Sequence, residues 1–575
     1  MVEIKGIAAS RGIAIGPISK LTKPDLSFDR RKISDPEAEI DRLEQALERV
    51  QVQLEATYQA AKQDLGQEEA AIFQAQAMIL KDPELMSGVK EQIREGQLNA
   101  EAALKERSEQ YAGKLEKLDD EYFQQRAADV RDVIDQTLAE LLGVAQEIHL
   151  LEEPSIVLAA DLTPSDTVNL DKSKVLGFLT AGGGSTSHTA ILARGLRIPA
   201  VVGAGSDALG LPEGAEIILD GTRGVVISKA DPEMIASYRS RQERAEQAFQ
   251  KARQDSGRPA QTRDGHQVEV VANIGNLSDV EPAQEFGAEG VGLLRTEFVY
   301  LDSPSLPDEE QQTQIYREIL DAFEDQPVIL RTLDIGGDKE LPYLDLPQEA
   351  NPFLGLRAIR LSLTRIPLFK TQLRAALRAG AGRNLKIMFP MISQLDELQK
   401  AKSILDDCRH ELESEAIPFA DNLEIGIMIE VPSAALLADQ FLPEIDFFSI
   451  GTNDLSQYTY AADRVNNQVS PLADGLQPAV LRLIARVIDT AHQAGKWVGL
   501  CGELAGRPAA IPILLGLGLD EFSMNPPAIP FAKQLIRGLN QDELRDIAHS
   551  ALDLSSAQAV KAYITEHVPQ IKEFL

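Results

Sequence analysis

The chain has 575 residues, more than one hydrophobic core normally organises, so we expect several domains. Acidic side chains outnumber basic ones by 89 to 57, and the formal charge of -32 argues against binding to nucleic acid or to an anionic membrane surface. Neither a run of about 20 apolar residues nor a basic, then apolar, signal sequence is present, so we expect a cytoplasmic protein without membrane insertion.

A helical block is predicted from residue 34 to about 143. This stretch is charged and poor in glycine and proline, and its apolar residues recur at helical spacing. Asp35 and Pro36 are typical of a helix cap followed by proline at the first helical position. Strand-like runs precede the block and follow it. The pattern therefore predicts an α/β domain, residues 1–21 and 146–230, with a helical domain inserted at 22–145.

A polar helix is predicted next, within a linker at 231–258, and a different pattern follows it. In residues 259–575 short apolar runs recur, separated by enough residues for a helix, which suggests a (β/α)8 barrel of the TIM type. The eight runs are 268–272, 291–294, 328–330, 387–389, 425–429, 447–450, 497–500 and 522–524. Polar residues follow them directly, at the strand ends where such barrels place their active sites.

A histidine stands on a glycine-rich turn in the first of these regions. Residues 182–194 place His188 shortly after three consecutive glycines, at the expected start of a helix. The backbone N–H groups of such a helix start could receive a phosphate, and a neutral imidazole nitrogen can accept a phosphoryl group and pass it on. The glycine-rich loop alone leaves a helix-capping histidine equally plausible.

Two arginines and two acidic residues follow strands of the predicted barrel. Arg295 and Arg331 end two successive strands, and forked guanidinium groups suit a phosphate and a carboxylate at once. A structural salt bridge is the alternative for either arginine. Glu430 and Asp454 follow two further neighbouring strands, which suits Mg²⁺ held by one or two carboxylates and by substrate oxygens.

The two cysteines are too few for a disulfide framework or a metal-thiolate site. Cys501 lies between glycines at a strand end that faces the same mouth, where a thiol could take part in proton chemistry. Cys408 lies in a helical stretch, and we expect it to act as a small buried packing residue.

The stretch 182–203 resembles the phosphohistidine signature of the phosphoenolpyruvate-utilising enzymes. Over nearly the full length, the order of the motifs resembles enzyme I of the bacterial sugar phosphotransferase system. The resemblance implies that His188 takes the phosphoryl group of phosphoenolpyruvate, releasing pyruvate, and passes it to the phosphocarrier protein HPr, docked on the helical domain. It also implies a swivelling phosphohistidine domain and a homodimer formed through the barrel.

The resemblance also implies roles for residues of the barrel. Glu430 and Asp454 become the ligands of Mg²⁺, and Cys501 becomes the acid that protonates the enolpyruvate carbon. The residues it places around the substrate are Arg295, Arg331, Arg357, Asn453, Asp454 and Arg464.

The sequence departs from the family pattern in two places. Residues 470–478 differ from the sequence that the family pattern has after the Asp463-Arg464 motif. We therefore expect the rim of the substrate mouth to differ as well. Gln76 stands where some relatives have histidine, which predicts a shifted carrier preference.

Two other functions remain as alternatives. One is a dikinase of the phosphoenolpyruvate synthase type, which is disfavoured because no P-loop motif is present. The other is a non-catalytic regulatory paralogue, which is disfavoured by the intact site residues.

Overall fold

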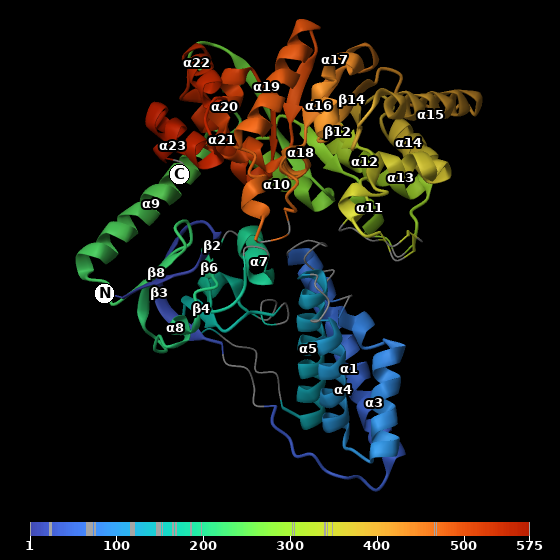
Figure 1. Ribbon diagram of the computed structural model, residues 1–575, viewed down its shortest axis with the longest axis vertical. Helices are drawn as coiled ribbons and strands as arrows, with labels where there is room; N and C mark the ends of the chain where they lie inside the picture. Colours follow the sequence, from blue (N-terminus) through green and yellow to red (C-terminus); the bar gives the residue numbers. More distant parts are fainter. Residues whose placement is uncertain are drawn as a thin grey trace. The chain divides into compact units, whose positions relative to one another are not determined.

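The computed structural model describes residues 2–573 with short gaps, and it divides the chain into two units, Met1–Glu246 and Gln247–Leu575 (Figure 1). The gaps are 22–25, 65–72, 74–75, 116–120, 145–150, 152, 164–165, 167–169, 185–186, 197, 302, 304, 338–340, 342, 345, 348, 465 and 467. Within the described part of the chain, none of the helices is long and apolar enough to cross a membrane.

The first unit contains an eight-stranded sheet in the order β1-β8-β7-β3-β4-β5-β6-β2. Its strands are β1 (Val2–Lys5), β2 (Ile7–Ser10), β3 (Ile13–Lys20), β4 (Ser155–Ala159), β5 (Val175–Thr180), β6 (Ala200–Val202), β7 (Glu216–Asp220) and β8 (Val225–Ser228). Strands β3 to β6 include parallel pairs, and β3 pairs directly with β4 across the long helical segment between them. The sheet thus combines strands that precede the helical segment, β1 to β3, with strands that follow it, β4 to β8. Helices α7 (His188–Leu196) and α8 (Ser206–Leu209) also belong to this α/β part.

Within the described residues, four long helices between β3 and β4 form a separate core. They are α1 (Pro36–Asp64), α3 (Pro83–Gly96), α4 (Ala100–Leu115) and α5 (Glu121–Leu142). Leu43, Val50 and Ile134 are fully buried in this core, which shares no residue with the clusters of the sheet. Helix α1 begins as predicted, because the Asp35 carboxylate accepts the Ala38 N–H at 3.1 Å and so caps the first turn. The predicted helical insertion is confirmed.

Helix α9 (Pro232–Gln254) is the predicted linker helix, and its C-terminal end packs into the second unit. The Phe249 ring lies 5.4 Å from that of Phe531 and 6.2 Å from that of Phe286. Just beyond the helix, the buried Lys533 ammonium donates to the Ser256 carbonyl at 3.0 Å and to the Gly287 carbonyl at 2.6 Å. The end of the linker is therefore built into the barrel rather than free of it.

The second unit is a closed barrel of eight parallel strands, as predicted. The strands are β10 (Gln267–Ile274), β11 (Val291–Arg295), β12 (Val328–Arg331), β13 (Leu385–Phe389), β14 (Glu424–Ile429), β15 (Phe447–Ile450), β16 (Trp497–Leu500) and β17 (Glu521–Met524). Strand β10 pairs with both β17 and β11 and so closes the ring, and the short β9 (Ala260–Gln261) pairs with β10 outside it.

The barrel helices follow the strands in sequence. They are α10 (Val280–Glu285), α11 (Glu297–Leu301), α12 (Glu309–Ala322), α13 (Ala358–Thr364), α14 (Ile366–Ala379), α15 (Leu395–Ser414), α16 (Pro432–Leu436), α17 (Ala438–Phe441), α18 (Thr452–Tyr460), α19 (Pro478–Gln493), α20 (Ile511–Leu517), α21 (Ile529–Arg537), α22 (Gln541–Ala551) and α23 (Ala557–His567).

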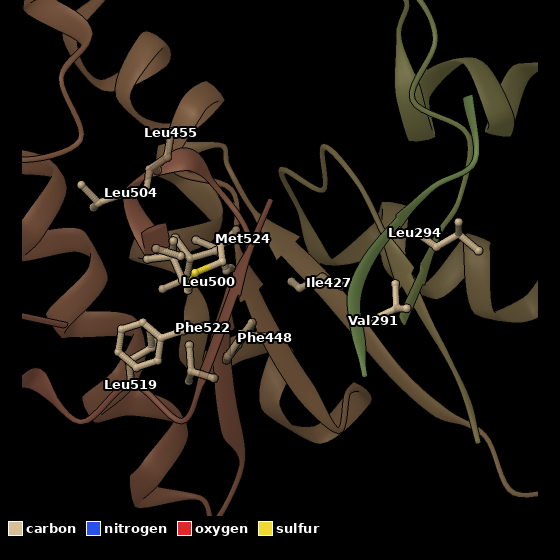
Figure 2. Packing of buried hydrophobic residues seen from close by; sticks show 14 of the residues in the cluster. Val291, Leu294, Ile427, Phe448, Leu455, Leu500, Leu504, Leu519, Phe522 and Met524 are labelled. Carbon is tan, nitrogen blue, oxygen red and sulfur yellow. The ribbon is translucent and has the colours of Figure 1, made fainter. Parts of the chain in front are cut away.

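The strands are apolar along most of their length because both of their faces are buried. One set of side chains, including Phe448 and Phe522, joins the large core that the strands share with the helices (Figure 2). The alternate set forms a second, smaller cluster that includes Ile329, Met428 and Cys501. The barrel interior is therefore packed, and its chemistry is confined to the strand ends.

Candidate active site

The residues predicted for the barrel site lie at the carboxyl ends of its strands. Arg295 and Arg331 are the last residues of β11 and β12, Glu430 directly follows β14, and Cys501 directly follows β16. Asp454 lies in the first turn of α18, just after β15. In a parallel barrel these ends open on one face, so the fold brings together side chains that are up to 206 positions apart, from 295 to 501.

Arg331 is buried among acidic groups. Its guanidinium lies 2.7 Å from Glu297 Oε1 and 3.0 Å from Asp334 Oδ2. The salt bridge that was the structural alternative for this arginine is therefore present. However, the buried Nε of Arg331 has no hydrogen-bond partner among the described residues. A buried N–H group without a partner is energetically costly. The Nε–H of the Arg331 guanidinium is therefore available to a further acceptor.

Arg357 shares an acidic partner with Arg331. Its Nη2 lies 3.0 Å from Asp334 Oδ1, and its Nη1 lies 3.2 Å from Asp454 Oδ1. The Nε of Arg357 is also buried without a partner among the described residues. The carboxylate of Asp334 therefore bridges two guanidinium groups, each of which keeps an unused donor.

The remaining predicted contacts are more exposed. Arg464 Nη1 lies 3.6 Å from Asp454 Oδ2, with its side chain 30% exposed. Asn453 Oδ1 accepts the backbone N–H of Glu503 at 3.2 Å, which leaves its amide N–H groups available. Arg295 is half-buried and forms no ion pair with any residue that the structure describes. Its charge is therefore not neutralised by an ion pair within the described part of the chain.

Glu430 is a buried carboxyl group with an unfavourable charge. Its Oε1 accepts the backbone N–H of Met391 at 2.6 Å. Burial, followed by repulsion from Asp454 and Asp334, raises the pKa of Glu430 to about 8. A cation between Glu430 and Asp454 would relieve this repulsion. Gly451 leaves room for this carboxylate, because a Cβ atom at that position would lie 3.2 Å from Glu430 Oε2.

The pair of carboxylates fits a hard divalent cation that keeps several non-protein ligands. Oxygen donors are the ligands such cations prefer, and Mg²⁺ in particular is often held by only one or two carboxylates together with water and phosphate oxygens. No group of three or more His, Cys, Asp or Glu side chains suited to a metal occurs in the described part of the chain.

Cys501 is buried at the base of the same mouth. Its thiol is directed at the Ile450 carbonyl, with Sγ 3.8 Å from the oxygen. Burial raises the pKa of the Cys501 thiol to about 11, so the group is protonated at neutral pH and can act as a proton donor. Cys408, in contrast, lies fully buried in α15 within the helix–strand core, and burial raises its pKa to about 12.

His188 is the first residue of α7, as its sequence context predicted, while its side chain lies outside the described residues. The turn before it is tight. Gly183 has a φ of +88°, which favours glycine, and the Ser187 N–H donates to the Gly184 carbonyl at 3.1 Å. The backbone of His188 therefore occupies the amino end of a helix, where N–H groups without helical partners favour a phosphate.

Three residues around the barrel site were missed at the sequence level. They are Glu297, Asp334 and Tyr458. Glu297 and Asp334 follow Arg295 and Arg331 by two and three positions, and an acid so close to a strand-end arginine was a usable signal. Tyr458 gave no such signal, because it stands 101 positions from Arg357, whose guanidinium it contacts.

The family models that match this chain define its class. They are the N-terminal domain of phosphoenolpyruvate-utilising enzymes over residues 5–126, the mobile domain of these enzymes over 151–224, and their phosphoenolpyruvate-binding domain over 249–541. Together with the barrel and its strand-end arginines and acids, they make this chain a phosphoenolpyruvate-utilising enzyme.

Curated relatives narrow the class to one family. A phosphoenolpyruvate-protein phosphotransferase of Geobacillus stearothermophilus is 50% identical over 564 residues, covering 98% of this chain and 97% of that protein. Those of Bacillus subtilis and Listeria monocytogenes are 48% and 47% identical over 571 residues each, covering 98% and 99% of this chain and 100% of both proteins. The chain belongs to the phosphoenolpyruvate-protein phosphotransferase family. Its reaction is phosphoryl transfer from phosphoenolpyruvate to protein, the first step of the sugar phosphotransferase system.

Proposed function

We propose that His188 is the residue that receives the phosphoryl group, and that the strand ends of the barrel hold phosphoenolpyruvate. Arg331 and Arg357 each keep a buried Nε donor, and Arg295 is a half-buried cation without an ion-pair partner in the described structure. These groups suit the phosphate and the carboxylate of the substrate, with Asn453 and Arg464 at its edge. The observation that carries the proposal is that Arg331 and Arg357 lie at the strand ends, share the carboxylate of Asp334, and each keep a buried Nε without a partner among the described residues.

The chemistry divides between two protein groups. A ring nitrogen of His188 attacks the phosphorus, and the bond between phosphorus and the enol oxygen breaks, which leaves phosphohistidine and the enolate of pyruvate. The Cys501 thiol then gives its proton to the enolate carbon, and pyruvate forms. Mg²⁺ held by Glu430 and Asp454 would supply positive charge to the phosphate oxygens. The guanidinium groups share that role, since phosphoryl transfer depends mainly on positioning and charge neutralisation.

The finer features of the assembly are also proposals. We propose the phosphocarrier protein HPr as the acceptor from His188, the helices of residues 22–145 as its docking site, and a homodimer formed through the barrel. The predicted boundaries at 21, 145, 230 and 258 stay predictions. Gln76 donates to Asp132 at 2.8 Å and is fully buried, which shows why a change at this position would alter the helical core as well as any carrier contact.

Separated halves of the chain test the division of labour. We expect residues 1–246 to exchange phosphoryl groups with phosphorylated HPr but not with phosphoenolpyruvate, since each unit has its own core and the substrate groups lie in the barrel. Residues 247–575 should bind phosphoenolpyruvate with Mg²⁺ and leave HPr unlabelled, whereas the intact chain should label it. The measurement is transfer of ³²P from labelled phosphoenolpyruvate. Cutting at 246, rather than after the end of α9, keeps Phe249 in the barrel half. Labelling of the first half by phosphoenolpyruvate alone would contradict the proposal.

Replacement of Glu430 tests the metal site. Glu430→Gln keeps the shape of the side chain and removes its charge, so we expect the Mg²⁺ concentration for half-maximal phosphorylation to rise by about tenfold or more. Glu424→Gln is a matched control, because Glu424 begins the same strand and pairs with Lys386 at 2.9 Å. A chelator should stop the reaction in all variants. A normal Mg²⁺ response in Glu430→Gln would remove this residue from the ligand set.

A further inference from the structure

The hydroxyl of Tyr458 links two elements of the substrate mouth. It donates to the Phe353 carbonyl, with an O···O distance of 2.5 Å, and it accepts a hydrogen bond from Arg357 Nη1 at 3.1 Å. Burial raises the pKa of Tyr458 to about 12, so the hydroxyl keeps its proton at neutral pH and can serve as donor and acceptor at once. Tyr458 lies in α18, the helix that also carries Asp454.

The segment that precedes Arg357 is held in a defined shape. Both carboxylate oxygens of Glu349 accept the N–H of Leu356, at 2.9 and 3.1 Å, and the Leu354 N–H donates to the Asn351 carbonyl at 2.9 Å. These bonds are internal to residues 349–357, which we name the Phe353 loop. Its link to α18 is made by the Tyr458 hydroxyl and by the ion pair of Arg357 with Asp454.

The ring of Phe353 also lies beneath two cations of the site. The guanidinium carbon of Arg357 is 5.8 Å from the ring centroid, and that of Arg464 is 5.9 Å from it. Both arginines also contact Asp454, at 3.2 Å and 3.6 Å. The position of the Phe353 loop therefore affects both guanidinium groups at once.

Tyr458 provides a neutral hydrogen-bond acceptor for Arg357, so it does not reduce the positive charge of the guanidinium. Asp334 and Asp454 each neutralise part of that charge, whereas a phenol oxygen occupies an N–H without adding a negative charge. A third carboxylate in its place would compete with the phosphate of the substrate. A neutral acceptor orients the guanidinium and leaves its positive charge available.

We propose that Tyr458 is a positioning residue for phosphoenolpyruvate binding: its hydroxyl ties the Phe353 loop to α18 and presents Arg357 to the substrate phosphate. The inference rests on the proposed role of Arg357 as a substrate ligand. Tyr458 acts through Arg357 and contacts no reacting atom.

Tyr458→Phe removes the hydroxyl and keeps the ring. We expect the Kd of phosphoenolpyruvate, measured by calorimetry on the full chain carrying His188→Ala with Mg²⁺, to rise about tenfold, because a hydrogen bond to a charged group is lost. In the otherwise unaltered enzyme KM should rise similarly while kcat changes less than about threefold. Tyr460→Phe, on the same helix, is the control and should bind normally, and both variants should unfold at the same temperature.

A double-mutant cycle decides whether Tyr458 works through Arg357. Arg357→Lys by itself should weaken binding, and adding Tyr458→Phe should then cost less than about twofold more, since the two groups act as a unit. An equal tenfold loss in both backgrounds, or no loss in Tyr458→Phe, would overturn the positioning role while leaving the proposed function intact. Normal binding by Arg357→Lys would overturn both the role of Tyr458 and that of Arg357.

Discussion

Replacement of His188 by alanine is expected to abolish labelling of the protein by ³²P-phosphoenolpyruvate and yet to leave substrate binding nearly unchanged. The acceptor nitrogen is lost, but the arginines and acids of the barrel belong to a different unit of the chain. Calorimetry with Mg²⁺ should therefore give a Kd within about twofold of that of the unaltered protein, as expected for independent sites.

The chemistry of the label provides a second check on His188. In the unaltered protein the adduct should be labile in acid and stable in alkali, as a phosphorus–nitrogen bond requires. His549→Ala is a suitable control, because His549 lies exposed on α22, where its ring contacts the Arg545 carbonyl of the same helix. An acid-stable label, or an equal loss of labelling and of binding in His188→Ala, would show that the acceptor has been misplaced.

Cys501→Ala is expected to slow phosphorylation of the protein by phosphoenolpyruvate by about 10²- to 10⁴-fold, the usual contribution of a positioned acid. Transfer between phosphorylated His188 and the carrier should keep its rate, because only the first step forms an enolate. Rapid-quench measurement of the two half-reactions separates these effects. Turnover of phosphoenolpyruvate at the normal rate would instead assign Cys501 to packing.

The pH dependence of the first half-reaction offers an independent test of the thiol. Burial raises the pKa of Cys501 to about 11, above the usual value for a thiol, so the donor form persists through neutral pH and is lost only as the pH approaches that value. The contribution of Cys501 to the rate should thus stay level between pH 7 and about pH 9. Cys408→Ala should show the same profile as the unaltered enzyme, since Cys408 lies in the helix–strand core.

The spacing of apolar residues in the sequence was sufficient to predict the architecture. The strands of a parallel barrel are buried on both faces, so they appear as short apolar runs whose spacing leaves room for a helix, and all eight predicted runs coincide with strands. The helical insertion was equally accessible, because an amphipathic helix shows its buried face at i, i+3 and i+4, and the Asp35 cap is a local feature. Resemblance to a known family supplied predictions that spacing could not, above all the proposed roles of Arg357 and Arg464 as substrate ligands.

The sequence by itself thus determined the order of the parts and the residue types at the strand ends, because both depend on near neighbours in the chain. Only the tertiary structure decided how these groups are paired. Closure of the barrel places Asp334 between Arg331 and Arg357, and buries Glu430 beside Asp454 so that its pKa rises to about 8. Asp334 follows Arg331 by only three positions, but its pairing with Arg357 and the approach of Glu430 to Asp454 join residues from different strand ends. Burial and repulsion act through space, so no local pattern encodes these two pairings.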